Sequence, residues 1–158
     1  MRGTVDRKKR ILAPDEQFAS TTVEKFINYV MKGGKKQVAK KIVYSSLEMA
    51  SKDLKKEPLE IFNYVISAVA PAVEVRSRRI GGANYQIPME VKEPRRTSLA
   101  MRWIIEGARS KQGKKMAEKL AMEYKDIFAG VGVAMKKRTD THKMAEANKA
   151  FAHFARVR

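Results

Sequence analysis

The chain has 158 residues, of which 34 are Lys or Arg and 17 are Asp or Glu, so its formal net charge is +17. This length fits one domain with its own core, and so large a charge excess indicates a polyanionic partner, most often a nucleic acid. The absence of cysteine excludes disulfides and thiolate metal sites, and no apolar run approaches the roughly 20 residues of a membrane helix.

The first expected segment is a basic N-terminal arm, residues 1–19, which shows no helical period and no apolar stretch of the signal-peptide type. Residues 20–158 are expected to form one helical domain that binds nucleic acid. Its first helix follows Ser20 and has apolar residues at i, i+3, i+4 and i+7, namely Val23, Phe26, Ile27 and Val30. Gly33-Gly34 ends it, and a second helix is predicted to bury Val38, Ile42, Val43, Leu47 and Met49.

A third helix begins near Pro58 and ends before Pro71, with an apolar stripe of Ile61, Phe62, Val65, Ile66 and Val69. The period then changes from 3.6 to 2, which predicts a β-hairpin over residues 73–91 around the turn segment Gly81-Gly82-Ala83-Asn84. Pro88 favours an isolated two-stranded ribbon. Its base, with Val73, Val75, Met89 and Val91, is expected to pack on helices, whereas the arginines near its tip have little core to join, so the ribbon should project.

Helical periodicity resumes after Pro94 with Leu99, Trp103, Ile104 and Ala108, and again after Gly113 with Met116, Leu120, Tyr124 and Ile127. Beyond Gly130 and Gly132, a last helix is predicted to run through Met144, Asn148, Phe151 and Ala155. The predicted fold class is therefore mainly α: a single domain of about six helices with a protruding two-stranded β-hairpin arm between helices 3 and 4.

Three successive cations, Lys136-Lys137-Arg138, precede Thr139-Asp140, a plausible helix cap. If the helix starts there, the cations stand beside an N-terminus that attracts anions. If it starts at Val133, they oppose the positive end of the helix dipole unless an anion is bound. We interpret both placements as phosphate binding, although such a triplet alone is more often a solvated charge run.

Arg78-Arg79 in the hairpin and Arg95-Arg96 at its exit could bracket a groove, since the planar fork of arginine suits phosphates and bases. Tyr85, beside the turn, is either a platform on which a base stacks or an aromatic residue packed on a neighbouring strand.

We find no pattern typical of an enzyme. Gly33-Gly34-Lys35-Lys36 lacks the earlier glycine and the following Ser or Thr of a phosphate-binding loop, which excludes nucleotide hydrolysis. His142 and His153 would lie roughly 16 Å apart on a continuous helix, too far to share a metal ion. No cofactor, metal or small-molecule substrate is expected.

The segment from Ser77 to Pro88, SRRIGGANYQIP, resembles the arm of the seventh protein of the small ribosomal subunit, bacterial type. Leu99 to Ile104 and Lys136 to His153 resemble the same family, and the likeness covers essentially the whole chain. It implies a primary binder of small-subunit (16S-type) rRNA that organises a multi-helix junction and nucleates assembly of the subunit head. It also implies a cytoplasmic location in the ribosome, or in the equivalent compartment of an organelle.

The resemblance further assigns roles to individual positions. Its rRNA-binding positions fall on Arg2, Arg7, Lys8, Lys9, Arg10, Lys35, Lys36, Arg76, Arg78, Arg79, Arg95, Arg96, Arg102, Arg109, Lys111, Lys114, Lys115, Lys136, Lys137, Arg138, His142 and Lys143. Its arm tip, near the exit-site tRNA and possibly mRNA at the subunit interface, falls on Gly81, Gly82, Ala83, Asn84 and Tyr85. The remaining implied partners are neighbouring small-subunit proteins of the head and platform. The N-terminal arm matches the family pattern only loosely.

Two other classes compete with this interpretation. An architectural DNA protein could use the basic ribbon in the minor groove, but such arms insert an apolar wedge and the tip Gly81-Gly82-Ala83-Asn84 offers none. An enzyme acting on RNA is disfavoured because the sequence shows no acid–base or metal constellation.

Overall fold

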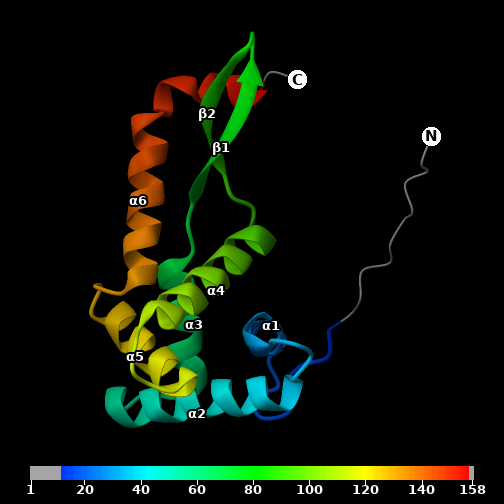
Figure 1. Ribbon diagram of the computed structural model, residues 1–158, viewed down its shortest axis with the longest axis vertical. Helices are drawn as coiled ribbons and strands as arrows, with labels where there is room; N and C mark the ends of the chain where they lie inside the picture. Colours follow the sequence, from blue (N-terminus) through cyan, green and yellow to red (C-terminus); the bar gives the residue numbers. More distant parts are fainter. Residues whose placement is uncertain (1–11, 157–158) are drawn as a thin grey trace, which may run out of the picture.

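The computed structural model describes residues 12–156, which form six α-helices, one 3₁₀ helix and a two-stranded antiparallel sheet (Figure 1). In chain order the elements are α1 (Thr21–Val30), α2 (Lys36–Leu54), α3 (Pro58–Val69), β1 (Val73–Ile80), β2 (Ala83–Glu90), α4 (Glu93–Ser110), α5 (Met116–Phe128), α6 (Val133–Ala147) and η1 (Lys149–Arg156). The predicted mainly α fold, with a hairpin between the third and fourth helices, is confirmed. Within the described part of the chain, no helix is long and apolar enough to span a bilayer.

The core lies among α1 to α5, and the predicted apolar stripes of α1 and α3 are buried along their whole length. Ser20 begins α1, because its hydroxyl oxygen accepts a hydrogen bond from the backbone N–H of Val23. Phe26 of α1 meets Phe62 of α3 edge to face, with ring centroids 5.4 Å apart. The side chains that hold α1 and α3 together are thus members of the apolar stripes predicted from the sequence.

The predicted inner face of α2 is wrong at its first position, because Val38 is 53% exposed. The buried stripe runs instead through Ala39, Val43 and Leu47, spaced four residues apart. One residue corresponds to about 100° around a helix, so Val38 points away from this stripe. An apolar side chain is therefore left on the surface beside the α1–α2 loop.

The prediction of one continuous last helix is also wrong. Helix α6 ends at Ala147, and Asn148 leaves the helical conformation while its side-chain amide donates to the carbonyl oxygen of Met144 at 2.8 Å. The chain turns there into η1, and Met144 is 49% exposed. The short polar side chain of asparagine competes with the helical hydrogen bonds, which explains the end of the helix at this residue.

The hairpin turn is tighter than the four-residue segment predicted for it. Gly81 and Gly82 form the turn with φ of 58° and 90°, the left-handed values of a type I′ turn, and Ala83 pairs directly with Ile80. Pro88 lies in β2 opposite Val75, in a sheet that has only these two strands among the described residues. The expectation of an isolated ribbon is confirmed.

Helix α6 stands along one side of the hairpin, and η1 crosses behind its outer half (Figure 1). At the base of the ribbon Val91 is buried as expected, together with Ile87, which is 1% exposed. The expectation that the tip has little to pack against is wrong. Tyr85 of β2 contacts Phe151 and Phe154 of η1, with ring centroids 5.4 Å apart in each pair, because the bend at residue 148 directs η1 onto the ribbon.

Residues 12–19, the described end of the predicted N-terminal arm, contact the helical body. The Asp15 carboxylate accepts hydrogen bonds from the backbone N–H groups of Phe18 and Ser20, both at 2.9 Å, and from the Tyr44 hydroxyl on α2. Phe18 also packs edge to face on Tyr44, with ring centroids 5.7 Å apart. This part of the predicted arm is therefore attached to α2.

A completely buried carboxylate, that of Glu123 on α5, joins α4, α5 and α6. Its Oε1 accepts a hydrogen bond from the backbone N–H of Ala134 at the start of α6 (3.0 Å), and its Oε2 lies 3.0 Å from the ammonium group of Lys111. A Cβ atom at Gly107 would approach Oε1 to 2.5 Å, and one at Gly132 to 3.0 Å. Gly107 therefore has no room for a side chain while Glu123 is in place, and a side chain at Gly132 would be tightly packed against the same carboxylate.

Candidate nucleic-acid interface

Three of the predicted RNA-binding residues, Arg95, Arg102 and Arg109, recur at intervals of seven along α4. Seven residues are nearly two turns, so these exposed side chains form a row about 21 Å long on one side of the helix. The opposite side of α4 is buried in the core through Ala100, Ile104 and Ala108. We call the three residues the α4 arginine row; its fixed spacing suits a series of phosphates.

Helix α1 lies beside the α4 arginine row. The guanidinium carbon of Arg102 is 5.6 Å from the centre of the Tyr29 ring on α1. A side-chain hydrogen bond with Ser98 lowers the pKa of Tyr29, burial opposes that shift, and Arg102 adds to it. Two shallow hollows lie between α1 and α4, one lined in part by Lys25 and the other by Tyr29, Arg102 and Arg109. We call this region the α1–α4 groove.

The loop between α1 and α2 brings more positive charge to the end of the row. Gly33 and Gly34 have φ of 56° and 73°, a left-handed conformation that lets the chain reverse before α2. Lys36 forms an ion pair with Glu24 of α1, whereas Lys35 is exposed and has no ion pair with any described residue. Of the two predicted lysines, Lys35 is thus the one with a free charge.

At the other end of the row, one carboxylate holds two of the predicted arginines. Glu74 of β1 is 7% exposed, and its oxygens lie 2.6 Å from Nε of Arg76 and 2.7 Å from Nε of Arg95. Burial raises the pKa of Glu74, but the hydrogen bonds from Arg95 and Arg76 outweigh it, so the pKa is lowered. Glu74 therefore fixes the base of the hairpin against the start of α4.

Helix α6 begins at Val133, which selects the second of the two placements considered for the basic triplet. The protein itself supplies the required anion, because the Glu123 carboxylate sits at this N-terminus and Lys137 pairs with Glu106 at 2.5 Å. Arg138 donates to the carbonyl oxygen of Ala68 near the end of α3 at 2.7 Å. Only Lys136 of the triplet is exposed without a partner among the described residues, so the triplet is in part structural.

His142 lies on α6 against the base of the hairpin. Its Nε2 accepts a hydrogen bond from the backbone N–H of Ala72 at 3.2 Å, which requires the neutral ring. Burial lowers the pKa of His142, and the nearby Arg138 and Arg96 lower it further. This histidine connects α6 to the arm, and the next residue along the helix, Lys143, is exposed.

The tip of the arm is polar, but its aromatic residue is engaged. Tyr85 packs on η1 rather than on a neighbouring strand, where Arg78 is its partner. Arg78 itself donates to the carbonyl oxygen of Phe154 at 3.3 Å, and Arg79 on the other face of the ribbon is exposed. Of the two roles considered for Tyr85, aromatic packing is found, although with a different element.

Comparison with known proteins shows the family of this chain. The family model of ribosomal protein S7p/S5e matches residues 2–149. The chain belongs to this ribosomal protein family. Its relatives include small ribosomal subunit protein uS7 of Thermotoga maritima, 53% identical over 93% of this chain and 95% of the relative. That of Thermosipho africanus is 55% identical over 92% and 94%, and that of Chloroflexus aggregans 49% identical over 99% and 98%.

Membership of the S7p/S5e family makes the chain a structural constituent of the ribosome, and rRNA binding follows from the family, which is not an enzyme class. The remaining predicted rRNA-binding residues differ in their surroundings. Lys114 and Lys115 are exposed before α5, whereas Lys111 is tied to Glu123 and Asp126. The predicted Arg2, Arg7, Lys8, Lys9 and Arg10 lie outside the described residues.

Two lysines of the candidate nucleic-acid interface were not predicted from the sequence. They are Lys25 in the α1–α4 groove and Lys32, which lines a pocket together with Arg109. Lys32 lies three residues before Lys35-Lys36, so the sequence does offer a signal for it, whereas Lys25 stands between Glu24 and Phe26 and belongs to no basic cluster. A signal for the α4 arginine row does exist, because a seven-residue interval on a predicted helix places side chains on one side.

Proposed function

We propose that this chain is a primary binder of small-subunit rRNA that holds a multi-helix junction in one arrangement and so nucleates assembly of the subunit head. The observation that carries the proposal is the α4 arginine row, whose three exposed arginines are fixed on a rigid, well-packed helix. The α1–α4 groove beside it adds Lys25, and the loop before α2 adds Lys35.

In this mechanism the protein acts by position and charge. Side chains cannot read the deep groove of duplex RNA easily, so recognition rests on phosphate geometry and on nucleotides outside the duplexes. A row about 21 Å long can contact phosphates of more than one RNA helix where these converge. The cations at its ends would then fix the angle between the RNA helices, which is the step that later assembly needs.

We propose a separate role for the arm, as the resemblance implies: its tip, Gly81 to Tyr85, lies near the exit-site tRNA and possibly mRNA. Two features support an arm of fixed direction, namely the Glu74 contacts at its base and the packing of η1 on Tyr85. Neighbouring proteins of the head and platform would contact other surfaces, in the cytoplasmic ribosome or its organellar equivalent.

The experiment that tests the first role compares two ligands at one salt concentration. The full-length protein is titrated with a small-subunit rRNA fragment containing the junction and with duplex DNA of equal charge, and hydroxyl-radical footprinting locates the protected nucleotides. We expect tighter binding to the junction and protection on several converging helices. Equal affinity for the DNA would instead favour an architectural DNA-binding protein.

A variant pair connects binding to the named residues. Arg102→Gln with Arg109→Gln should reduce the dependence of log affinity on log salt concentration by about two, one for each lost phosphate contact. Lys52→Gln with Lys55→Gln is the matched control, because these exposed lysines lie at the far end of α2 from Lys35. An unchanged salt dependence in the arginine variant would contradict the role of the row.

A further inference from the structure

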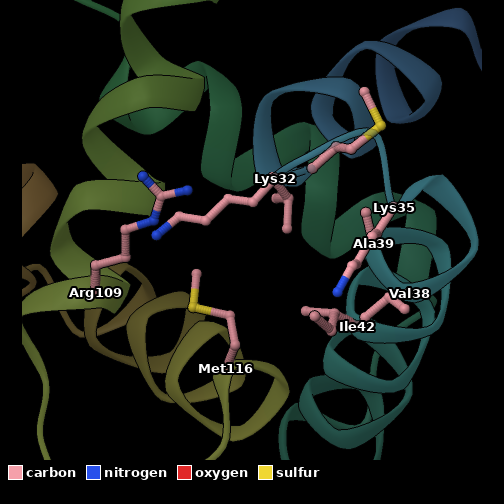
Figure 2. Close-up of a pocket in the computed structure, with 9 residues that line it drawn as sticks. Lys32, Lys35, Val38, Ala39, Ile42, Arg109 and Met116 are labelled. Atoms are coloured by element: carbon pink, nitrogen blue, oxygen red, sulfur yellow. The ribbon is translucent and has the colours of Figure 1, made fainter.

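A pocket of about 290 Å³ lies where the ends of four helices meet (Figure 2). It is lined by residues at the end of α1 and in the loop after it, at the start of α2, at the end of α4 and at the start of α5: Val30, Met31, Lys32, Lys35, Val38, Ala39, Ile42, Arg109 and Met116. Its volume is at the lower limit for pockets that hold small organic molecules. The space therefore suits a single planar ring system.

The inner surface of this pocket is apolar. Val30 and Ala39 are buried beneath it, Ile42 and Met116 are half-buried, and Val38 is 53% exposed at its edge. Val38 is one of only five large apolar side chains that are exposed in the described part of the chain. An apolar ligand placed here would remove this surface from water.

The edge of the pocket is positively charged. Figure 2 shows the Lys32 side chain reaching across the opening toward Arg109, with Lys35 on the side of α2. None of these three cations forms an ion pair or side-chain hydrogen bond with a described residue, and the described lining contains no carboxylate. Three unpaired cations so placed repel one another, and a bound anion would relieve that repulsion.

We propose that this pocket receives one unstacked base of a single-stranded nucleotide in the small-subunit rRNA. Val38, Ile42 and Met116 would contact the base, while the three cations bind the phosphates on either side of it. The inference rests on the proposed rRNA binding and names the part of the RNA that the pocket takes. A nucleotide combines an apolar ring face, which matches the apolar inner surface of the pocket, with a neighbouring phosphate, which matches the cations at its edge.

Proteins that recognise single-stranded RNA commonly stack unpaired bases on aromatic side chains or on the plane of an arginine. Pockets that receive a base flipped out of a duplex also hold it between apolar side chains. Stacking of a base on an aromatic side chain is worth about 1–3 kcal/mol, or roughly a 5- to 150-fold change in affinity, and we use this range as the scale for a base held in the apolar pocket. An acidic peptide with an apolar anchor would share part of this chemistry. A nucleotide, however, uses all three cations through the two phosphates that flank its base.

The test fills the pocket without changing the net charge. Val38→Trp places an indole over the pocket from an already exposed position, and Val131→Trp is the matched control at a residue that is 75% exposed in the loop before α6. We expect Val38→Trp to weaken binding to the rRNA junction fragment by about 5- to 150-fold with an unchanged salt dependence. The melting temperature should not change in either variant, and Val131→Trp should bind like the parent.

A second measurement identifies the base. Abasic substitutions are introduced one at a time at the unpaired nucleotides of the fragment, and affinities are measured for the parent and for Val38→Trp. We expect one abasic position to weaken binding by the parent by at least about fivefold and to have no further effect on Val38→Trp, because both changes remove the same contact.

Other outcomes overturn the inference. If the parent binds the junction but Val38→Trp and every abasic fragment bind equally well, no base occupies the pocket, although the proposed rRNA binding stands. If Val38→Trp binds RNA normally but fails to join subunits reconstituted with the other proteins, the occupant is a protein. If the parent does not bind the junction at all, the proposed function itself fails.

Discussion

The two ends of α4 carry the same kind of charge in different surroundings. At its start, Arg95 shares the buried carboxylate of Glu74 with Arg76, so one negative charge offsets part of two positive charges. At its end, Arg109 has no ion pair among the described residues and shares a pocket with Lys32 and Lys35. A paired arginine fixes the geometry of the arm, whereas an unpaired one keeps its charge for a polyanion. Fold stability and RNA affinity should therefore respond separately to substitutions at the two ends.

The largest effect is expected from the unpaired end. Replacing Lys32, Lys35 and Arg109 together with Gln should lower rRNA affinity and reduce the slope of log affinity against log salt concentration by about three. The free energy of unfolding should change little, because no described ion pair is lost. Binding titrations over a series of KCl concentrations, with urea unfolding of the same protein, measure both quantities.

The claim that these three cations serve RNA binding would be contradicted if the triple variant unfolds readily while its folded fraction binds rRNA with an unchanged salt dependence. Arg95→Gln is the matched change at the other end of the helix. It should lower the free energy of unfolding by about 1 kcal/mol, a value reduced by the partial exposure of the arginine, and alter the slope less than Lys35→Gln alone.

The next effect in size concerns the carboxylate at the paired end. Glu74→Gln should lower the free energy of unfolding by about 1.5–3 kcal/mol, since it weakens charged hydrogen bonds to Arg76 and Arg95. The slope of the salt dependence should not fall, because no cation is removed. Urea unfolding at pH 7 measures the first quantity, and a stability equal to that of the parent would show that the contacts at the arm base are unimportant.

The pH dependence of the same variant gives an independent check. Because the pKa of Glu74 is lowered in the folded protein, its contribution to stability is complete above its ordinary value of 4.5 and is lost as the pH falls below that value toward the folded pKa. The stability difference between the parent and Glu74→Gln should therefore shrink in acid. A constant difference from pH 7 to pH 3 would contradict this assignment.

A smaller effect is expected where η1 meets the arm. Tyr85→Ala and Phe154→Ala should each destabilise the outer half of the hairpin, and the double variant should show a coupling energy of about 0.5–1.5 kcal/mol. Tyr64→Ala, which instead removes a stacked contact with Phe128, should show no coupling to Phe154→Ala. Amide hydrogen exchange in β2 provides a second readout, and zero coupling between Tyr85 and Phe154 would mean that η1 does not brace the arm.

The smallest effect belongs to His142. Its pKa is lowered in the folded protein, so its contribution to stability is complete above its ordinary value of 6.5 and is lost as the pH falls through that value. For a half-exposed ring this amounts to about 0.5 kcal/mol or less. We expect His142→Gln to lose less stability between pH 7.5 and pH 5 than the parent, as measured by urea unfolding. An identical loss in both proteins would leave the histidine without this role.

Much of the fold could be predicted because the helices are amphipathic and their stripes are long. The residues of α1 and α3 that recur every three or four positions are the ones that meet in the core. The end of α6 could not be predicted in this way, since Phe151 and Ala155 continue the helical period beyond Asn148. Phe151 instead packs on Tyr85 in the arm, and such a contact between residues distant in sequence cannot be predicted from helical periodicity.

The sequence predicts which residue types form the candidate site, but it does not predict which of the cations form ion pairs within the protein. The sequence places Lys111 among the basic residues of the α4–α5 connection, yet burial between Glu123 and Asp126 gives it a structural role. Glu74 alternates with apolar residues and would be expected on the outer face of the ribbon, whereas it is buried between Arg76 of the same strand and Arg95, which is 21 residues away in sequence. Tertiary contacts of this kind decide which cations remain unpaired. The spacing of Lys and Arg in the sequence therefore cannot distinguish the cations that bind RNA from those that form ion pairs within the protein.

The buried Glu123 carboxylate also limits how this sequence can change over time. Gly107 lacks room for even a methyl group while the carboxylate occupies its place, a methyl group at Gly132 would crowd the same carboxylate, and Lys111 would lose its closest buried partner without it. A shorter residue at position 123 would open that space and at the same time remove the acceptor for the Ala134 N–H. Substitutions at Gly107, Glu123 and Gly132 should therefore be tolerated best in combination. The residues at which α4, α5 and α6 meet are then expected to change together during evolution.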